Sequence, residues 1–424
     1  MEHQKYIKLI AKIAILLLAA SFLLLPGIIR EENTLIGDKP YHHLSLADKE
    51  LNFSSIKNEL SFGWSFILRY ISVKTALFVL GLASALLLFL NLEMMKLNQR
   101  LLAAGLFVLS PAFIYMFNVG DKVGIAFAVS LIISYLIIKE RYKTSIPLFI
   151  LLPFLDVLIS IFVLIAAGLY FIYLKTSKSL FYYVLLLFIL GISLFGEWNF
   201  EFISDLGAFI GISVFALVFA LFCFILLWRE FLPLYGILLI MILLSLKFEF
   251  GIFYLSAFIS ILLSLCISKV YDRKWESELI RNLTILFIFC GLLFSGISYA
   301  NRLSQEMPNE SLFKALEILP EGSVVFSDIG YGNWIKYSGK ESVWDTSGFL
   351  DKAKERELNS IIDSKDAFIT RQILSKYKVD YVLIDSNLME KWNERGIFYL
   401  LDYDYKGFRQ IYDQDGVIIW RHFK

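Results

Sequence analysis

Long apolar runs with almost no charge recur along the first 300 residues, and they restrict the fold more than any other feature. A bilayer core of about 30 Å takes roughly 20 apolar residues to cross as a helix. The sequence therefore predicts a polytopic α-helical membrane protein of about 11 spans. The runs are Ile7–Ile29, Thr75–Leu92, Leu101–Phe117, Val123–Ile138, Ile146–Leu155, Val157–Leu174, Ser179–Phe195, Leu206–Trp228, Leu232–Leu246, Ile252–Ser268 and Leu279–Ala300.

The distribution of charge divides the chain into two parts. Hydrophobic residues make up 58% and charged residues 19%, whereas a soluble domain has about 45–50% and 25%. From Asn301 onward lie 37 of the 79 charged residues. This distribution predicts that residues 1–300 form a membrane domain and that residues 301–424 form a soluble domain. The net charge of +1 offers no bulk attraction to a polyanion, so we expect no nucleic-acid partner.

Basic residues concentrate in alternate connections between the predicted spans. The positive-inside rule then places the N-terminus in the cytoplasm and, after an odd number of spans, the C-terminal domain on the extracytoplasmic side. We expect the protein to be integral to the cell membrane. This alternation needs two crossings between Lys143 and Lys175, which divides the apolar stretch at Asp156. Residues 30–74 become a long outer loop, in which apolar spacing from Leu51 to Ile67 predicts an interfacial helix.

The soluble part has the pattern of a small α/β domain. Residues 323–327 and 381–385 are short apolar runs that suit buried strands. The composition of residues 350–378 favours helices. The pattern of residues 408–423 predicts a hairpin that turns at Asp-Gln-Asp-Gly, residues 413–416. This part contains no Gly-rich phosphate loop and no Cys/His cluster. The three cysteines of the chain all lie in apolar runs, which excludes a disulfide framework or a zinc ligand set.

Acidic residues gather on the predicted outer side of the membrane. They are Asp38, Asp121, Asp156, Glu197, Asp205 and Glu249. Carboxylates at a bilayer edge suit a divalent cation, and a cation there could hold a phosphate head group. For any one of them, a solvated loop charge is the simpler interpretation. Capping of the following helix is an equal alternative for Asp121 and the favoured one for Asp156.

Five short stretches then follow one another in a characteristic order. They are Gly-Asp-Lys-Pro-Tyr-His-His at 37–43, Gly-Asp-Lys at 120–122, Gly-Glu-Trp-Asn at 196–199, Ser-Leu-Lys-Phe-Glu-Phe at 245–250 and Ser-Asp-Ile-Gly-Tyr-Gly-Asn-Trp-Ile at 327–335. In order and topology they resemble the GT-C type of membrane glycosyltransferase, most of all the oligosaccharyltransferase catalytic subunit. The last stretch is similar to that family's Trp-Trp-Asp-Tyr-Gly motif; its Tyr-Gly half matches, whereas the two Trp and the Asp do not.

The resemblance implies a function and a set of residues. Such enzymes move a sugar or oligosaccharide from a polyprenyl phosphate or pyrophosphate to an extracytoplasmic acceptor, which can be a protein or a glycan. It implies that Asp38 and Asp121 are catalytic and, with His43 or its neighbour His42, hold Mn²⁺ or Mg²⁺. Lys247, in the position of the family's Arg, would act as a point charge on the donor phosphate.

Acceptor binding falls, by the same resemblance, to Glu197, Tyr331 and Trp334. Each assignment has a structural alternative: Glu197 with Trp198 could anchor the interface, Lys247 could reach outward as a helix-end residue, and the two aromatic residues could simply pack the soluble domain.

Two other functions remain open. Lys39 and Lys122 stand where the family often has a second acid, which favours a non-catalytic GT-C-like membrane subunit that binds glycan, lipid or a partner protein. A transporter ranks last, because the sequence shows no internal repeat and the centres of the spans lack charges.

Overall fold

The computed structural model describes residues 2–47, 63–175, 198–227, 232–346, 352–392, 396–404 and 406–423. The chain forms two compact units. The helical unit comprises Met1–Glu31 and Leu51–Gln305, and the α/β unit comprises Glu32–Glu50 and Glu306–Lys424. The segment after the first helix, which the sequence placed with the membrane domain as part of loop 30–74, thus groups with the C-terminal residues.

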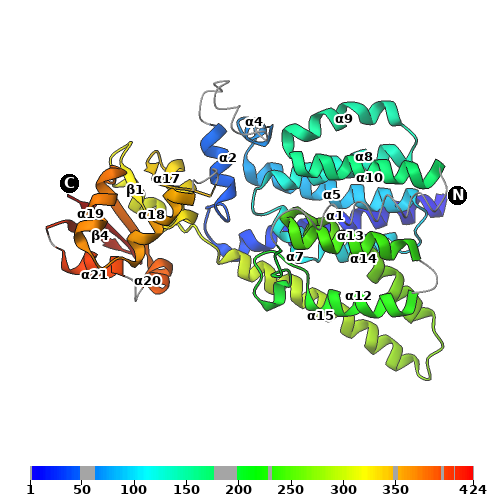
Figure 1. Ribbon diagram of the computed structural model, residues 1–424. Coiled ribbons are helices and arrows are strands. Elements are labelled where there is room, and N and C mark those ends of the chain that lie inside the picture. The colour runs from blue at the N-terminus through cyan, green and yellow to red at the C-terminus, as the bar shows by residue number, and fades with distance from the viewer. Residues whose placement is uncertain are drawn as a thin grey trace. The chain divides into compact units, whose positions relative to one another are not determined.

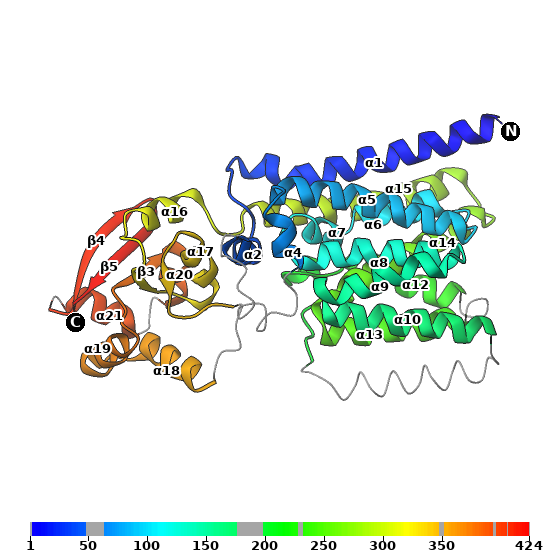
Figure 2. The same ribbon diagram turned by 90° about the horizontal axis from the view of Figure 1, so that it is seen from above.

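The helical unit is a bundle of helices that lie side by side (Figures 1 and 2). Four described helices are long and apolar enough to cross a membrane: α1, α5, α14 and α15. Shorter apolar helices lie at α8, α9, α10, α12 and α13, and the run Ser179–Phe195 lies outside the described residues, so a count of about 11 spans stays a prediction. The bounds are α1 Glu2–Arg30, α4 Gly63–Leu68, α5 Val73–Met94, α6 Arg100–Val108, α7 Pro111–Met116, α8 Lys122–Ile138, α9 Tyr142–Leu155, α10 Val157–Lys175, η1 Ser204–Leu206, α12 Val214–Leu227, α13 Leu232–Lys247, α14 Glu249–Asp272 and α15 Glu278–Ser304.

Two predicted spans begin or break elsewhere than the sequence indicated. The run 101–117 divides into α6 and α7, because the Ser110 hydroxyl accepts a hydrogen bond from Phe113 N and Pro111 starts a new helix. The run 206–228 becomes helical only from Val214. The residues before it form the short helix η1 and a bridge between Ile203 and Ile212.

Helix α14 lies at the centre of the bundle, since its most apolar stretch is 78% buried against 28% for α1. Glycines allow neighbouring segments of this bundle to approach one another closely. A Cβ atom on Gly251 would lie 2.5 Å from the backbone of Leu244 in α13, and one on Gly296 of α15 would lie 2.5 Å from the Leu109 carbonyl oxygen. Contacts between backbones over small residues are the usual means of helix association in lipid.

The α/β unit contains a five-stranded sheet in the order β2-β1-β3-β5-β4. Strands β2, β1 and β3 are parallel, and β5 runs antiparallel to β3 and β4. The predicted strands, helices and hairpin of this region are confirmed; Asp415 and Gly416 adopt positive φ, as a two-residue hairpin turn requires. The bounds are α2 Lys39–Ala47, α16 Glu310–Glu317, β1 Val324–Phe326, η2 Ile329–Tyr331, α17 Gly332–Tyr337, β2 Glu341–Ser342, α18 Lys352–Asp363, α19 Ala367–Lys376, β3 Tyr381–Asp385, α20 Ser386–Trp392, α21 Gly396–Tyr403, β4 Phe408–Gln414 and β5 Val417–His422.

Candidate functional site

Asp38 lies in the α/β unit, directly before α2. One of its carboxylate oxygens, Oδ2, accepts a hydrogen bond from the Thr346 hydroxyl at 2.5 Å and a longer one from Asn333 Nδ2 at 3.4 Å. Asn333 Nδ2 also donates to Thr346 Oγ1 at 3.0 Å. The proposed catalytic carboxylate is therefore oriented by a hydroxyl and an amide from the C-terminal part of the chain.

The backbone around Asp38 is fixed by buried aromatic residues. Trp334 donates its indole N–H to the carbonyl of Gly37 at 3.0 Å, and Gly37 N donates to Met307 O at 2.8 Å. Gly37 has a φ of 81°, which a glycine adopts without strain. The ring of Tyr41 in α2 lies 5.2 Å from that of Phe313 and is buried in the core of the unit. These contacts hold Asp38 in a defined place relative to the sheet.

Tyr331 and Trp334, the predicted acceptor-binding residues, are both buried, and their rings meet edge to face at 4.8 Å. Burial, followed by the nearby Asp385 carboxylate, raises the pKa of Tyr331, so its hydroxyl is protonated at neutral pH. Asp385 ends β3, and Asp328 follows β1 on the parallel neighbour. Lys391 of α20 binds Asp328 at 2.6 Å. The carboxyl ends of these strands therefore present a phenol, two acids and one ammonium.

His43 is buried in α2, 5.1 Å from the His42 ring, centre to centre. Within the described residues, no group of three His, Cys, Asp or Glu side chains is placed to hold a metal ion. The predicted set of Asp38, His43 and Asp121 is divided between the units, since Asp121 belongs to the helical unit.

Asp121 occupies the N-cap position of α8, with extended backbone, yet its side chain makes no capping hydrogen bond there. The next residue, Lys122, lies 3.5 Å from Asp156. The carbonyl of Gly120 accepts a hydrogen bond from the buried Trp64 indole at 2.9 Å. The turn that carries Asp121 is thus anchored on both sides, and Asp121 itself has a further interaction.

Asp156 separates α9 from α10, which confirms the predicted division of the apolar stretch. It is 8% exposed, and its Oδ1 accepts a hydrogen bond from Ile159 N at 2.9 Å. The prediction that it caps the following helix is therefore confirmed.

Lys247 ends α13, and its ammonium lies 3.9 Å from the centre of the Trp198 ring. Asn199 N donates to Leu246 O at 2.7 Å, which brings the segment after residue 197 to this helix end. An ammonium above an indole face is a cation–π contact. Glu197 lies outside the described residues, but its neighbour Trp198 is described and is 43% exposed. The sequence singled out both motifs without predicting that they meet, because Trp198 and Lys247 lie 49 positions apart in the chain.

Two further acids of the predicted outer set have structural partners. Asp205 accepts hydrogen bonds from Val214 N at 2.6 Å and from the Ser295 hydroxyl at 2.7 Å, so it links the start of α12 to α15. Glu249, the first residue of α14, lies 3.4 Å from the Tyr115 hydroxyl.

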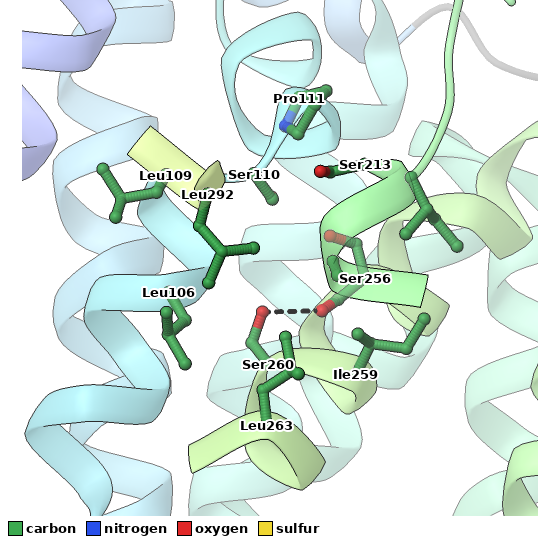
Figure 3. Close-up of a pocket in the computed structure, with 12 residues that line it drawn as sticks. Leu106, Leu109, Ser110, Pro111, Ser213, Ser256, Ile259, Ser260, Leu263 and Leu292 are labelled. Carbon is green, nitrogen blue, oxygen red and sulfur yellow. Dashed lines mark hydrogen bonds between the residues drawn. The ribbon is translucent and has the colours of Figure 1, made fainter. Parts of the chain in front are cut away.

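A small cavity lies between α6, α12, α14 and α15 and is lined in part by Ser110, Ser213, Ser256 and Ser260 (Figure 3). Its volume of about 20 Å³ suffices for a single water molecule and for no substrate. The Ser260 hydroxyl donates to the Ser256 carbonyl at 2.8 Å. This cavity is a feature of packing rather than a reaction site.

Comparisons with known proteins agree with this architecture. No protein-family model matches the sequence, and no curated protein matches it. Among solved structures, the apo form of the oligosaccharyltransferase of Archaeoglobus fulgidus is similar to this chain with a TM-score of 0.55, at 12% identity, over 97% of this chain and 74% of the other. The chain has an oligosaccharyltransferase-like fold. A second structure of that enzyme, tethered to an acceptor peptide containing the NVT sequon, gives a TM-score of 0.52 at the same identity and coverage.

Proposed function

We propose that this protein is a membrane glycosyltransferase that moves a sugar or oligosaccharide from a polyprenyl-linked donor to an extracytoplasmic acceptor. The observation that carries the proposal is the oligosaccharyltransferase-like fold over 97% of the chain. The ordered motifs at 37–43, 120–122, 196–199, 245–250 and 327–335 support it independently.

The donor phosphate is assigned to Lys247. When the bond from the sugar to the phosphate oxygen breaks, negative charge develops on that oxygen and must be stabilised. The Lys247 ammonium is a compact point charge held over the Trp198 ring. It would neutralise the leaving phosphate, and the half-exposed indole suits the boundary between lipid and water.

Asp38 and Asp121 are assigned as the catalytic carboxylates. A carboxylate can accept a hydrogen bond from an acceptor N–H or O–H and take its proton as the new bond to the sugar forms. Thr346 and Asn333 both bind Oδ2 of Asp38, so the other carboxylate oxygen, Oδ1, is assigned this role. Glu197, Tyr331 and Trp334 are assigned to the acceptor, the last two by shaping the ends of β1 and β3.

Dependence on Mn²⁺ or Mg²⁺ stays a prediction. The described residues provide no trio of metal-binding side chains, so the roles assigned to Lys247, Asp38 and Asp121 involve protein groups alone. An assay with and without a chelator tests the metal requirement directly.

Transfer of labelled sugar from a synthetic polyprenyl-linked donor to a peptide or glycan acceptor tests the function. We expect Asp38→Ala and Asp121→Ala each to lower the rate by about two orders of magnitude, the scale of losing a key electrostatic group. Asp402→Ala and Asp272→Ala remove exposed acids of the α/β unit and the helical unit and should leave the rate unchanged. Full activity in both site variants would refute the assigned carboxylates.

The second candidate is a non-catalytic membrane subunit with the same fold. It is favoured by the engagement of Asp38 with Thr346 and of Lys122 with Asp156. That candidate predicts no transfer by the wild-type chain, together with binding of glycan or lipid that tolerates Asp38→Ala.

A further inference from the structure

The helical unit carries a lipid-sized groove beside the middle of α1. A groove of about 470 Å³ runs between α1, α6 and α15, within the range of about 300–1,000 Å³ that is typical of small-molecule sites. Ile15 and Leu18 of α1, Leu102 and Gly105 of α6 and Phe289 of α15 line its apolar length. Figure 2 shows α1 along the edge of the bundle beside these helices. An acyl chain of a lipid matches such a lining.

One end of the groove is polar. Asn98 and Gln99 line it where α6 starts, and Gln99 is held by a 2.8 Å hydrogen bond to the Ser268 hydroxyl. The opposite end is lined by Leu109 and Leu18. The groove therefore matches the polarity of a lipid, because one end is lined by polar side chains and the other by apolar ones.

The polar end carries excess positive charge. Lys12 precedes the groove-lining Ile15 by one helical turn, on the same face of α1. Arg100 follows Gln99 directly and lies 5.7 Å from the Phe89 ring centre. Lys8 binds the Glu93 carboxylate at 2.7 Å, and Lys12 and Arg100 also act on that carboxylate. Among the described side chains at this end, three cations thus share the Glu93 carboxylate.

We infer that this groove binds one anionic phospholipid of the surrounding bilayer. One of its acyl chains lies along Ile15, Leu18 and Gly105, and its phosphate meets Lys12 and Arg100. Basic pockets between membrane helices bind anionic head groups, because each Lys or Arg near the surface adds to the attraction. The groove is lined by none of the residues assigned to catalysis, so this site is independent of the proposed transferase reaction.

Two pairs of variants separate the groove from the charge. Gly105→Leu fills the groove: a Cβ atom there meets only Leu18 Cδ2, at 3.8 Å, and the change favours the helix. Gly168→Leu is its control, since nothing lies within 4 Å of that position on α10. Lys12→Gln with Arg100→Gln removes two charges at the groove, and Arg141→Gln with Lys143→Gln removes two exposed charges elsewhere on the unit.

The measurement is native mass spectrometry of the full chain after equilibration with equimolar phosphatidylglycerol and phosphatidylcholine. We expect the wild type to retain one phosphatidylglycerol with about tenfold preference. The Lys12/Arg100 variant should lose the preference and Gly105→Leu should lose the lipid, whereas both controls keep them.

Three outcomes would overturn the inference. They are equal retention of the two lipids by the wild type, an unchanged preference in the Lys12/Arg100 variant, and displacement of phosphatidylglycerol by polyprenyl phosphate. The last result would assign the groove to a donor lipid instead.

Discussion

Two acidic residues, one in each unit of this protein, are held in different ways. In the helical unit, Asp156 accepts a hydrogen bond from the backbone N–H of Ile159, three residues further along the chain. In the α/β unit, Asp38 is bound by Thr346, which lies 308 positions away. The first arrangement is local and follows from the chemistry of helix starts. The second exists only because the fold brings distant segments together.

The two units use the same packing devices. In the helical unit, Gly251 brings its backbone against α13, and the buried Trp64 indole binds the Gly120 carbonyl. In the α/β unit, Gly332 brings its backbone against the Trp344 carbonyl, Trp334 binds Gly37, and Trp344 binds Ser327 at 2.6 Å. Small-residue packing also suits helices in lipid, where apolar area gives no advantage between helices.

The largest expected effect comes from overpacking at a glycine of the α/β unit. A Cβ atom on Gly332 would lie 2.2 Å from the Trp344 carbonyl oxygen, and backbone cannot yield as a flexible side chain can. Gly332→Ala should cost about 2–3 kcal/mol of local stability, measured as faster hydrogen exchange in peptides of β1 and β3. Gly330→Ala, whose Cβ would lie 3.7 Å from the Asp328 side chain, is the control and should exchange like the wild type.

A similar change tests the helical unit. The Cβ of Gly251→Ala would lie 2.5 Å from Leu244 and Ser245 of α13, so the variant should lose about 2 kcal/mol and unfold at a lower temperature in detergent. Gly168→Ala, in open space on α10, should be neutral or more stable. Equal unfolding temperatures for the two variants would mean that close backbone approach does not hold this unit together.

The attachment of residues 32–47 to the α/β unit can be tested at one indole. Trp334→Phe removes the donor to Gly37 O and leaves that carbonyl unpaired, at a cost of about 1–2 kcal/mol. Peptides covering 34–47 should then exchange faster. Trp344→Phe removes the bond to Ser327 instead and should loosen β1 while residues 34–47 stay protected. If both variants exchange alike at 34–47, Trp334 does not anchor the segment.

The smallest effect concerns a surface ion pair of the α/β unit. Arg371 binds Asp404 through two nitrogens, one at 2.6 Å, and this hydrogen bonding lowers the pKa of Asp404. Because the folded pKa is below the unfolded value of about 3.9, the pair stabilises at higher pH and the contribution is lost as pH falls through the folded pKa. Asp404→Asn should cost about 0.5 kcal/mol near neutral pH and nothing in strong acid. Thermal unfolding as a function of pH checks this, with the exposed Asp402→Asn as control; a cost that persists in acid would contradict the assignment.

Sequence predicts those features that depend on neighbouring residues. The apolar run Tyr381–Asp385 became a buried strand, Asp415-Gly416 a hairpin turn, and Asp156 a break between two helices. Ser110-Pro111 carried the same kind of local signal for a helix break, although the apolar run around it favoured one span.

Features that depend on distant contacts could not be predicted. Nothing in residues 32–47 indicates that the partners of this segment are Trp334, Asn333 and Thr346. The meeting of Lys247 with Trp198 likewise depends on how the chain returns to the end of α13. The candidate residues were recognisable by type and order, whereas their orienting partners required the fold.

The most direct test of the central claim follows the sugar on the donor lipid. Purified wild-type protein in liposomes that contain a labelled polyprenyl-linked sugar, supplied with peptide or glycan acceptors, should release the label from the lipid, and Lys247→Gln should slow that release at least tenfold. Label that stays on the lipid with every acceptor and divalent cation supplied would contradict the account and leave a non-catalytic membrane subunit.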